Sequence, residues 1–162
     1  MHVHEFMFRS ARGVTLSLER WTGQPVLIVN TASESRHARQ LEAFQRLYQE
    51  YQHSGLVVLG VPCNDFDGKE PLDGEDLDAY YWENHRVNFP LTQKYENIGR
   101  HPHPLFLSLR EEYTNDVLPQ GNYYKYLFSR DGELLEHWPT EIQPDDSGLH
   151  HQIERNVSAW CL

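Results

Sequence analysis

Two continuous apolar runs, separated by one amphipathic stretch, constrain the fold of this chain more than any other feature. The runs are Pro25–Val29 and Leu56–Val61, and Val/Leu/Ile runs without polar alternation are typical of strands buried on both faces. Between them, apolar residues recur at three- and four-residue spacing, which predicts a helix that Gly55 ends. The recurring residues are Leu41, Phe44, Leu47, Tyr48 and Tyr51. Strand, helix and strand in this order predict a right-handed parallel crossover.

The turn that follows the first run is the expected location of a functional site. In open α/β sheets, sites gather at the carboxyl ends of the strands, beside the first turn of the next helix. Here the small polar turn after Asn30 leads to Ser35. The loop Cys63–Pro71 follows the second strand, so we expect it to lie beside Ser35.

The remaining segments predict two hairpins and three further helices. Alternating apolar residues between Phe6 and Leu18 predict an N-terminal hairpin, and Asp131-Gly132 marks the turn of a second hairpin between Tyr124–Phe128 and Leu134–Trp138. Helices are predicted over Asp73–His85, after Pro102 and Pro104, and at the C-terminus, where Leu149, Ile153, Val157 and Trp160 share one face. Residues 87–91 are predicted to form a short extended segment.

Composition excludes several classes of partner. The chain has 162 residues, is 39% hydrophobic and carries a formal net charge of -10, so we expect one domain over residues 1–162 and neither nucleic acid nor an anionic membrane as a partner. No signal peptide and no membrane span is recognisable, which predicts a cytoplasmic protein. The two cysteines, Cys63 and Cys161, are far apart, so reduced thiols are expected.

Several segments, in this order and spacing, resemble the glutathione peroxidase family, a branch of the thioredoxin-like fold. Val26–Ser33 is similar to the family's strand and its Asn-Val-Ala-Ser turn, and Gln40, Leu47 and Tyr48 continue the match. The most specific segment is Gly55–Pro71, which resembles Gly-Leu-x-Val-Leu-x-Phe-Pro-Cys-Asn-x-Phe-Gly-x-Gln-Glu-Pro. Further agreement lies in Val87–Leu91, His103–Leu105, Asn122–Tyr126 and Arg130–Gly132. The resemblance implies an α/β, thioredoxin-like fold with a central mixed sheet flanked by helices and an N-terminal β-hairpin.

The resemblance also implies a family role in peroxide reduction during oxidative stress, at four active-site positions of which only Asn122 is retained. Family members use a cysteine or selenocysteine at the position of Ser35. Lys69 replaces a glutamine that helps to hold the reactive chalcogen, and Gly121 replaces a tryptophan whose indole N–H points at it. Arg36 replaces a glycine, and the position of the resolving cysteine in thiol-recycling members looks like Tyr81.

These replacements predict the loss of peroxidase activity. Peroxide reduction needs a thiolate or selenolate that attacks oxygen and is itself oxidised, and a serine hydroxyl cannot do this. The joint changes at Arg36, Lys69 and Gly121 favour a natural loss over a single engineered replacement at Ser35.

The leading hypothesis is a binding or regulatory protein with a remodelled pocket. Arg36, Arg39 and Lys69, together with the N–H groups of a helix start near Ser35, would accept a small anion such as glutathione. The competing interpretation is that these cations are solvated and balanced by Glu34, Asp67 and Glu70. No cofactor is expected.

The residues also allow three other interpretations: a residual thiol peroxidase, a hydrolase and a structural metal site. A residual thiol peroxidase would use Cys63, although free cysteines are more often small buried hydrophobes. A hydrolase would pair Ser35 with His37, but side chains two residues apart at a helix start point in different directions. A structural metal site would use some of the ten histidines, such as His2 and His4, His101 and His103, or His150 and His151, yet no partner at ligand spacing supports it.

Two remaining features have structural interpretations. Trp82, Trp138 and Trp160 are expected to pack in the core and its rim, and Asp145-Asp146 to match the dipole of the last helix.

The stretch Leu109–Gly121 is short and lacks the long insertion of tetrameric family members, so the resemblance implies a monomer or a weak dimer.

Overall fold

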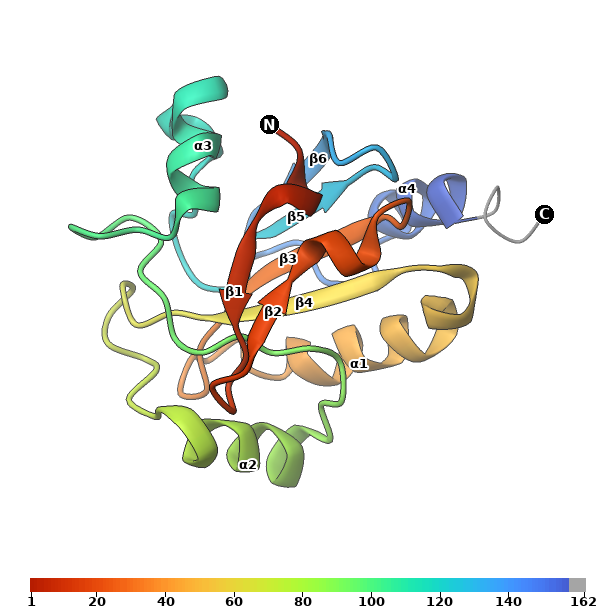
Figure 1. Cartoon of the computed structure of the whole chain (residues 1–162). Coiled ribbons are helices and arrows are strands. Elements are labelled where there is room, and N and C mark those ends of the chain that lie inside the picture. The colour runs from red at the N-terminus through yellow and green to blue at the C-terminus, as the bar shows by residue number, and fades with distance from the viewer. Residues whose placement is uncertain (158–162) are drawn as a thin grey trace.

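A four-stranded mixed sheet with the order β4-β3-β5-β6 forms the centre of the fold (Figure 1). The structure is a computed structural model and describes residues 1–157. β3 (Val26–Thr31) pairs in parallel with β4 (Val57–Pro62), and all twelve residues of these two strands are buried. β5 (Lys125–Phe128) runs antiparallel to β3, and β6 (Leu134–Trp138) antiparallel to β5. The two predicted buried strands and their parallel crossover are therefore confirmed.

Four α-helices and a small hairpin complete the fold. The helices are α1 (Gln40–Tyr51), α2 (Gly74–His85), α3 (Pro104–Glu112) and α4 (Ser147–Val157). The hairpin pairs β1 (Met7–Arg9) with β2 (Thr15–Ser17) as a separate two-stranded sheet. Short 3-10 turns cover Val3–Glu5, Leu18–Trp21, Gln52–Ser54 and Asn115–Val117. After the third of these turns, Gly55 adopts a left-handed conformation with φ of 102°, which glycine accepts without steric cost.

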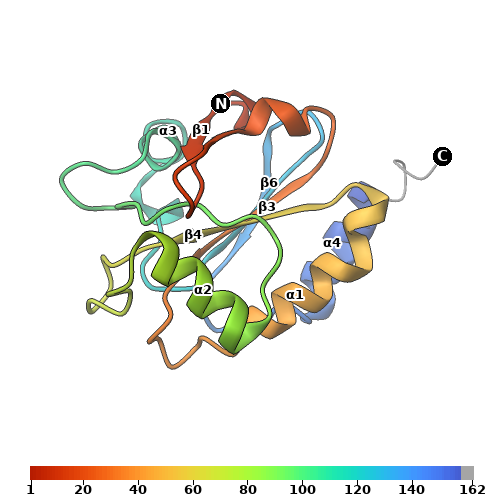
Figure 2. The ribbon, with the colours of Figure 1, turned by 60° about the horizontal axis from the view of Figure 1, so that its bottom comes forward.

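The two faces of the sheet carry separate hydrophobic cores. Alternate residues of a strand point to opposite faces, so Leu27 and Val29 pack with α1, α2 and α4 on one side. Val26 and Ile28 pack with β1, β2 and α3 on the other. Figure 2 shows α1 and α4 on the side of the sheet opposite to β1 and α3. This double cover explains why the central strands read as unbroken apolar runs.

The predicted extended segment at 87–91 lies against the outer edge of β4. Gly60 N–H donates to the Pro90 carbonyl at 2.9 Å, and Thr92 N–H donates to the Gly60 carbonyl at 2.9 Å. A Cβ atom on Gly60 would lie 2.7 Å from Leu91 Cδ2, so a larger residue here would force the Leu91 side chain to move. The segment thus covers an otherwise open edge of the sheet.

One sequence expectation is wrong: no helix starts at Ser35. Residues 33–39 form consecutive turns, and α1 begins at Gln40. The Ser35 hydroxyl accepts the His37 N–H at 3.1 Å, a local bond of the kind that competes with helix formation. The predicted contributions of Trp160 and Cys161 lie outside the described residues. Within residues 1–157, no helix combines the length and the apolar character that a membrane span requires.

Candidate functional site

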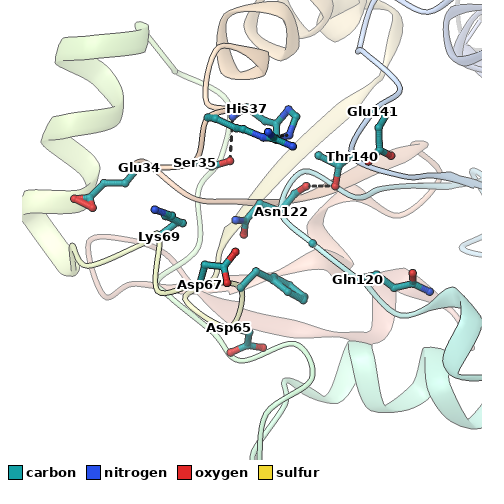
Figure 3. Close-up of a pocket in the computed structure, with 13 residues that line it drawn as sticks. Glu34, Ser35, His37, Asp65, Asp67, Lys69, Gln120, Asn122, Thr140 and Glu141 are labelled. Atoms are coloured by element: carbon teal, nitrogen blue, oxygen red, sulfur yellow. Dashed lines mark hydrogen bonds between the residues drawn. The ribbon is translucent and has the colours of Figure 1, made fainter.

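A half-open cleft of about 620 Å³ lies at the carboxyl ends of β3 and β4 (Figure 3). Four segments line it: the turn after β3, the loop after β4, the stretch before β5 and the stretch after β6. The lining residues are Glu34, Ser35, Arg36, His37, Asp65, Phe66, Asp67, Lys69, Gln120, Gly121, Asn122, Thr140 and Glu141. The predicted proximity of the loop after β4 to Ser35 is therefore confirmed, and the fold brings together all four positions implied by the resemblance: Ser35, Lys69, Gly121 and Asn122.

Ser35 is held by its own backbone turn. Its N–H donates to the Ala32 carbonyl at 3.3 Å, and its carbonyl accepts the Ala38 N–H at 3.0 Å. Because the hydroxyl oxygen already accepts the His37 backbone N–H, its own proton remains available as a donor to a ligand. The ring of His37 instead contacts Arg36, whose Nε lies 3.3 Å from His37 Nε2. The structure therefore forms no hydrogen bond between the Ser35 hydroxyl and the His37 ring, the pair that the hydrolase hypothesis needs.

The turn after β3 and the loop after β4 are tied together beneath the cleft. Glu34 N–H donates to the Lys69 carbonyl at 2.9 Å. The neighbouring carboxylate of Glu70 is fully buried and accepts the Ser33 N–H at 3.2 Å and the Ser33 hydroxyl at 2.5 Å. It also accepts the Tyr81 hydroxyl of α2 at 2.6 Å. Glu70 is thus a structural anchor and does not balance the cations of the cleft.

The opposite wall of the cleft is formed around Thr140. Its hydroxyl donates to the Asn122 carbonyl at 2.6 Å, and a Cβ atom on Gly121 would lie 3.2 Å from the same hydroxyl. Asn122 lies between Lys69 and Thr140 in Figure 3. Its Oδ1 is buried without a hydrogen-bond partner among the described residues. The space beside Gly121, where the resemblance places the family's tryptophan, is therefore bounded by the hydrogen-bonded hydroxyl of Thr140.

The charges of the cleft are mixed and do not form a purely cationic pocket. Arg36 and Lys69 line it, as predicted, but Arg39 is exposed, precedes α1 and does not line it. Four carboxylates also line the cleft: Glu34, Asp65, Asp67 and Glu141. One carboxylate oxygen of Asp65 is already engaged within the protein, because Oδ2 accepts the N–H groups of Asn97 and Ile98 at 2.7 and 2.9 Å. No sequence pattern predicts Asp65, Phe66, Gln120, Thr140 and Glu141 as lining residues. The loop after β4 contributes the first two, the stretch before β5 contributes Gln120, and the return of the chain after β6 contributes the last two.

Cys63 lies one residue beyond β4 but is not among the residues that line the cleft. Its side chain is 0% exposed, and its Sγ accepts the Asp65 N–H at 3.4 Å. Burial raises the pKa of the Cys63 thiol to about 12. At pH 7 only about one such thiol in 10⁵ is ionised, and the thiolate is the reactive form.

The other features singled out in the sequence have structural partners. His103 caps α3 by accepting the Leu105 N–H at 3.0 Å, and its ring stacks on Phe8. Burial lowers the pKa of His103. No group of three or more His, Cys, Asp or Glu side chains in residues 1–157 is arranged to hold a metal ion. Trp82 is 48% exposed beneath Arg86, and Trp138 packs at the edge of the core.

Comparisons with known proteins identify the family. A family model described as glutathione peroxidase matches residues 3–110. The glutathione peroxidase homolog BsaA of Staphylococcus aureus is 35% identical over 158 residues, covering 96% of each chain. The crystal structure of Trgpx in apo form has a TM-score of 0.77 at 25% identity and covers 98% of this chain and 96% of that chain. A thioredoxin family protein from Chlorobium tepidum has a TM-score of 0.69 at 10% identity, covering 97% of this chain and 96% of that chain, which shows the fold alone. This chain therefore belongs to the glutathione peroxidase family and has its thioredoxin-like fold.

Proposed function

We propose that this glutathione peroxidase homologue has lost peroxide reduction and acts as a binding or regulatory protein through the cleft at Ser35. The observation that carries the proposal is a hydroxyl, in place of a thiol, at the centre of the cleft. An oxygen at this position cannot be oxidised and re-reduced as sulfur is. The one thiol in residues 1–157 belongs to Cys63, which is buried outside the cleft lining and has a strongly raised pKa.

The donors left in the cleft favour an anionic group on the ligand. The Ser35 hydroxyl has a free proton, and Arg36 and Lys69 provide two cations beside it. The Lys69 side chain forms no hydrogen bond or ion pair with another residue in the described range 1–157, so its ammonium is available. Charge-assisted hydrogen bonds to a carboxylate or phosphate are about twice as strong as neutral ones.

The acceptors on the other side favour a positive group on the same ligand. Glu141 and Asp67 line the cleft together with the two cations, and Figure 3 shows Glu141 on the side of the cleft opposite to Lys69. A small zwitterion that places a carboxylate near Lys69 and an ammonium near Glu141 would use both sets. Glutathione, which carries carboxylates and one ammonium, has this charge pattern.

Calorimetric titration tests the ligand. We expect glutathione to bind the wild-type protein, and Arg36→Ala or Lys69→Ala to weaken binding by about 10- to 100-fold, because each removes a charged donor worth roughly 1.5–3 kcal/mol. Arg39→Ala is the matched control: it removes an arginine three residues from Arg36 that does not line the cleft, and should leave the affinity unchanged. Absence of heat with glutathione, phosphate and small carboxylates would refute the binding role, as would equal affinities in all variants.

A peroxidase assay tests the loss of activity. With hydrogen peroxide and either glutathione or thioredoxin as the reductant, the wild-type protein should show no turnover above the Cys63→Ser variant. Turnover that Cys63→Ser abolishes would instead establish the alternative, a residual thiol peroxidase that uses Cys63.

A further inference from the structure

Lys125 is a fully buried lysine whose amine reaches the wall of the cleft from behind. It lies on β5 and is 0% exposed. Its Nζ donates to the carbonyl oxygens of Pro139 at 3.1 Å and Thr140 at 3.2 Å. Gln40, the first residue of α1, donates its Nε2 to the same Thr140 carbonyl at 2.8 Å. The backbone that forms this wall is therefore held from the sheet and from α1 at once.

The position of Thr140 is transmitted directly to the cleft surface. The Thr140 hydroxyl donates to the Asn122 carbonyl, and Thr140, Glu141, Gly121 and Asn122 all line the cleft. The two bonds from Lys125 thus hold the backbone segment from which Thr140 and Glu141 enter the cleft lining, and the Thr140 hydroxyl links that segment to Asn122. Lys125 is not among the residues that line the cleft. Any effect of its amine on a ligand must therefore pass through the hydrogen bonds to Pro139 and Thr140.

Few charged groups lie near the Lys125 amine to compensate its positive charge. Glu141 is the charged residue whose field favours the protonated amine. The neighbours across the strands are Val29 on β3 and Trp138 on β6, and α1 contributes the neutral amide of Gln40. The next acidic residue of α1, Glu42, bonds to His85 of α2 instead. Burial therefore outweighs Glu141 and lowers the pKa of the Lys125 amine to about 7.

We propose that Lys125 is a positioning residue that fixes the 139–141 wall when its amine is protonated and loosens it when the amine is neutral, so that its proton controls the cleft. The neutral amine keeps two N–H groups but loses the charge that strengthens their hydrogen bonds to carbonyl oxygens. An anion bound in the cleft favours the ammonium, and by linkage the ammonium favours the anion. This second step rests on the proposed function.

Lysine-selective NMR tests the first step without a ligand. The chain has three lysines, Lys69, Lys94 and Lys125, so the ¹³Cε signals resolve individually. We expect the Lys125 signal to change with an inflection near pH 7, and the backbone amides of Thr140 and Glu141 to share that inflection. A Lys125 signal without an inflection below pH 9, or wall amides that titrate at a different pH, would overturn the proposal. This measurement uses wild-type protein, so it does not depend on a variant that folds.

Variants separate positioning from a merely structural role. In Lys125→Met the inflection at Thr140 and Glu141 should disappear, whereas His37→Gln, which removes the imidazole in the cleft lining, should retain it. Retention of the wall inflection in Lys125→Met would contradict the proposal.

Calorimetry in buffers of different ionisation enthalpy tests the second step. At pH 7.5, glutathione binding to the wild-type protein should take up a fraction of a proton, and Lys125→Met should lose this uptake. Binding without proton uptake in the wild-type protein would overturn the coupling. If glutathione, phosphate and small carboxylates give no heat at all, the proposed function fails, while the positioning role is still decided by the NMR titration.

Discussion

The carboxylate of Glu70 shows how single residues hold the floor of the cleft. It is buried without a cation and is satisfied by the Ser33 N–H, the Ser33 hydroxyl and the Tyr81 hydroxyl. The Tyr81 hydroxyl also lies 2.8 Å from Thr31 Oγ1, at the end of β3. A buried carboxylate is costly unless such donors surround it. Tyr81, at the position that resembles that of a resolving cysteine, is therefore a fixed support between α2 and the sheet.

Removal of one hydroxyl from this network should destabilise the protein. Tyr81→Phe leaves Glu70 with one donor fewer and Thr31 without its partner, so we expect a loss of about 1–3 kcal/mol in the free energy of unfolding. Urea denaturation measures it. Tyr113→Phe, which removes a hydroxyl from a 39% exposed tyrosine, is the control and should change stability by less than about 0.5 kcal/mol. Equal effects of the two substitutions would show that the Glu70 network contributes nothing.

The Cys63 thiol gives a pH-dependent prediction at the same scale. Because its pKa is raised to about 12, the thiolate population of the folded protein should rise about tenfold per pH unit between pH 7 and 10 and remain small throughout. In a Cys161→Ser background, iodoacetamide should react slowly at pH 8 and rapidly after unfolding in guanidinium chloride. Rapid alkylation of the folded protein at pH 7 would contradict the inert role of Cys63.

At the scale of the elements, α4 begins with a specific side-chain cap. Asp146 Oδ2 accepts the N–H groups of Gly148 at 3.0 Å and Leu149 at 3.1 Å, and these N–H groups lack partners within the helix. Asp145 is exposed. The acidic pair before the helix therefore divides into one capping residue and one surface charge.

Substitution of the cap should weaken α4 selectively. Asp146→Ala should lower the free energy of unfolding by about 1 kcal/mol, measured by thermal or urea denaturation. Asp145→Ala, which removes the same charge near the same dipole without the cap, should have a smaller effect. If both variants lose the same stability, the effect is that of the helix dipole and not of the hydrogen bonds.

The order and type of most elements could be predicted from local pattern. β3, β4, α1 and both hairpins follow from apolar periodicity and from turn residues such as Asp131-Gly132. The start of α1 could not, because the Ser35 hydroxyl and the His37 N–H close a local turn in a stretch without a helix-breaking residue. The cleft wall at Thr140 could not either, because it depends on where the chain returns after β6. Its residues are more than 100 positions from Ser35 and have no pattern that links them to it.

For the whole molecule, the buried amine of Lys125 makes stability depend on pH. Its pKa is lowered from 10.5 to about 7 in the folded protein, so between these values the unfolded chain binds a proton that the folded chain does not. The free energy of unfolding therefore rises with pH across this window, and below pH 7 the full cost of burying the charge remains. In the proposed role of Lys125, protonation therefore orders the cleft wall and at the same time lowers the free energy of unfolding.

The difference between the wild-type protein and Lys125→Met isolates this contribution, because other titrating groups are common to both. From pH 7 to pH 9 the wild-type protein should gain stability relative to the variant by about 1 kcal/mol per pH unit. Urea denaturation at several pH values measures the gain. A constant difference across this range would show that Lys125 stays protonated in the folded state.

The short distance between Gly121 and the Thr140 hydroxyl affects which of the family's residues could be restored in this cleft by substitution. A cysteine at position 35 changes one atom on an intact backbone, and a glutamine at 69 exchanges one exposed side chain for another. A Cβ atom at 121 would already lie 3.2 Å from the Thr140 hydroxyl, so an indole there requires Thr140 to shift within a wall that Lys125 and Gln40 also hold. If peroxide reduction is lost as proposed, the family residues at 35 and 69 could therefore be restored on the present backbone, whereas the one at 121 would require the cleft wall to move as well.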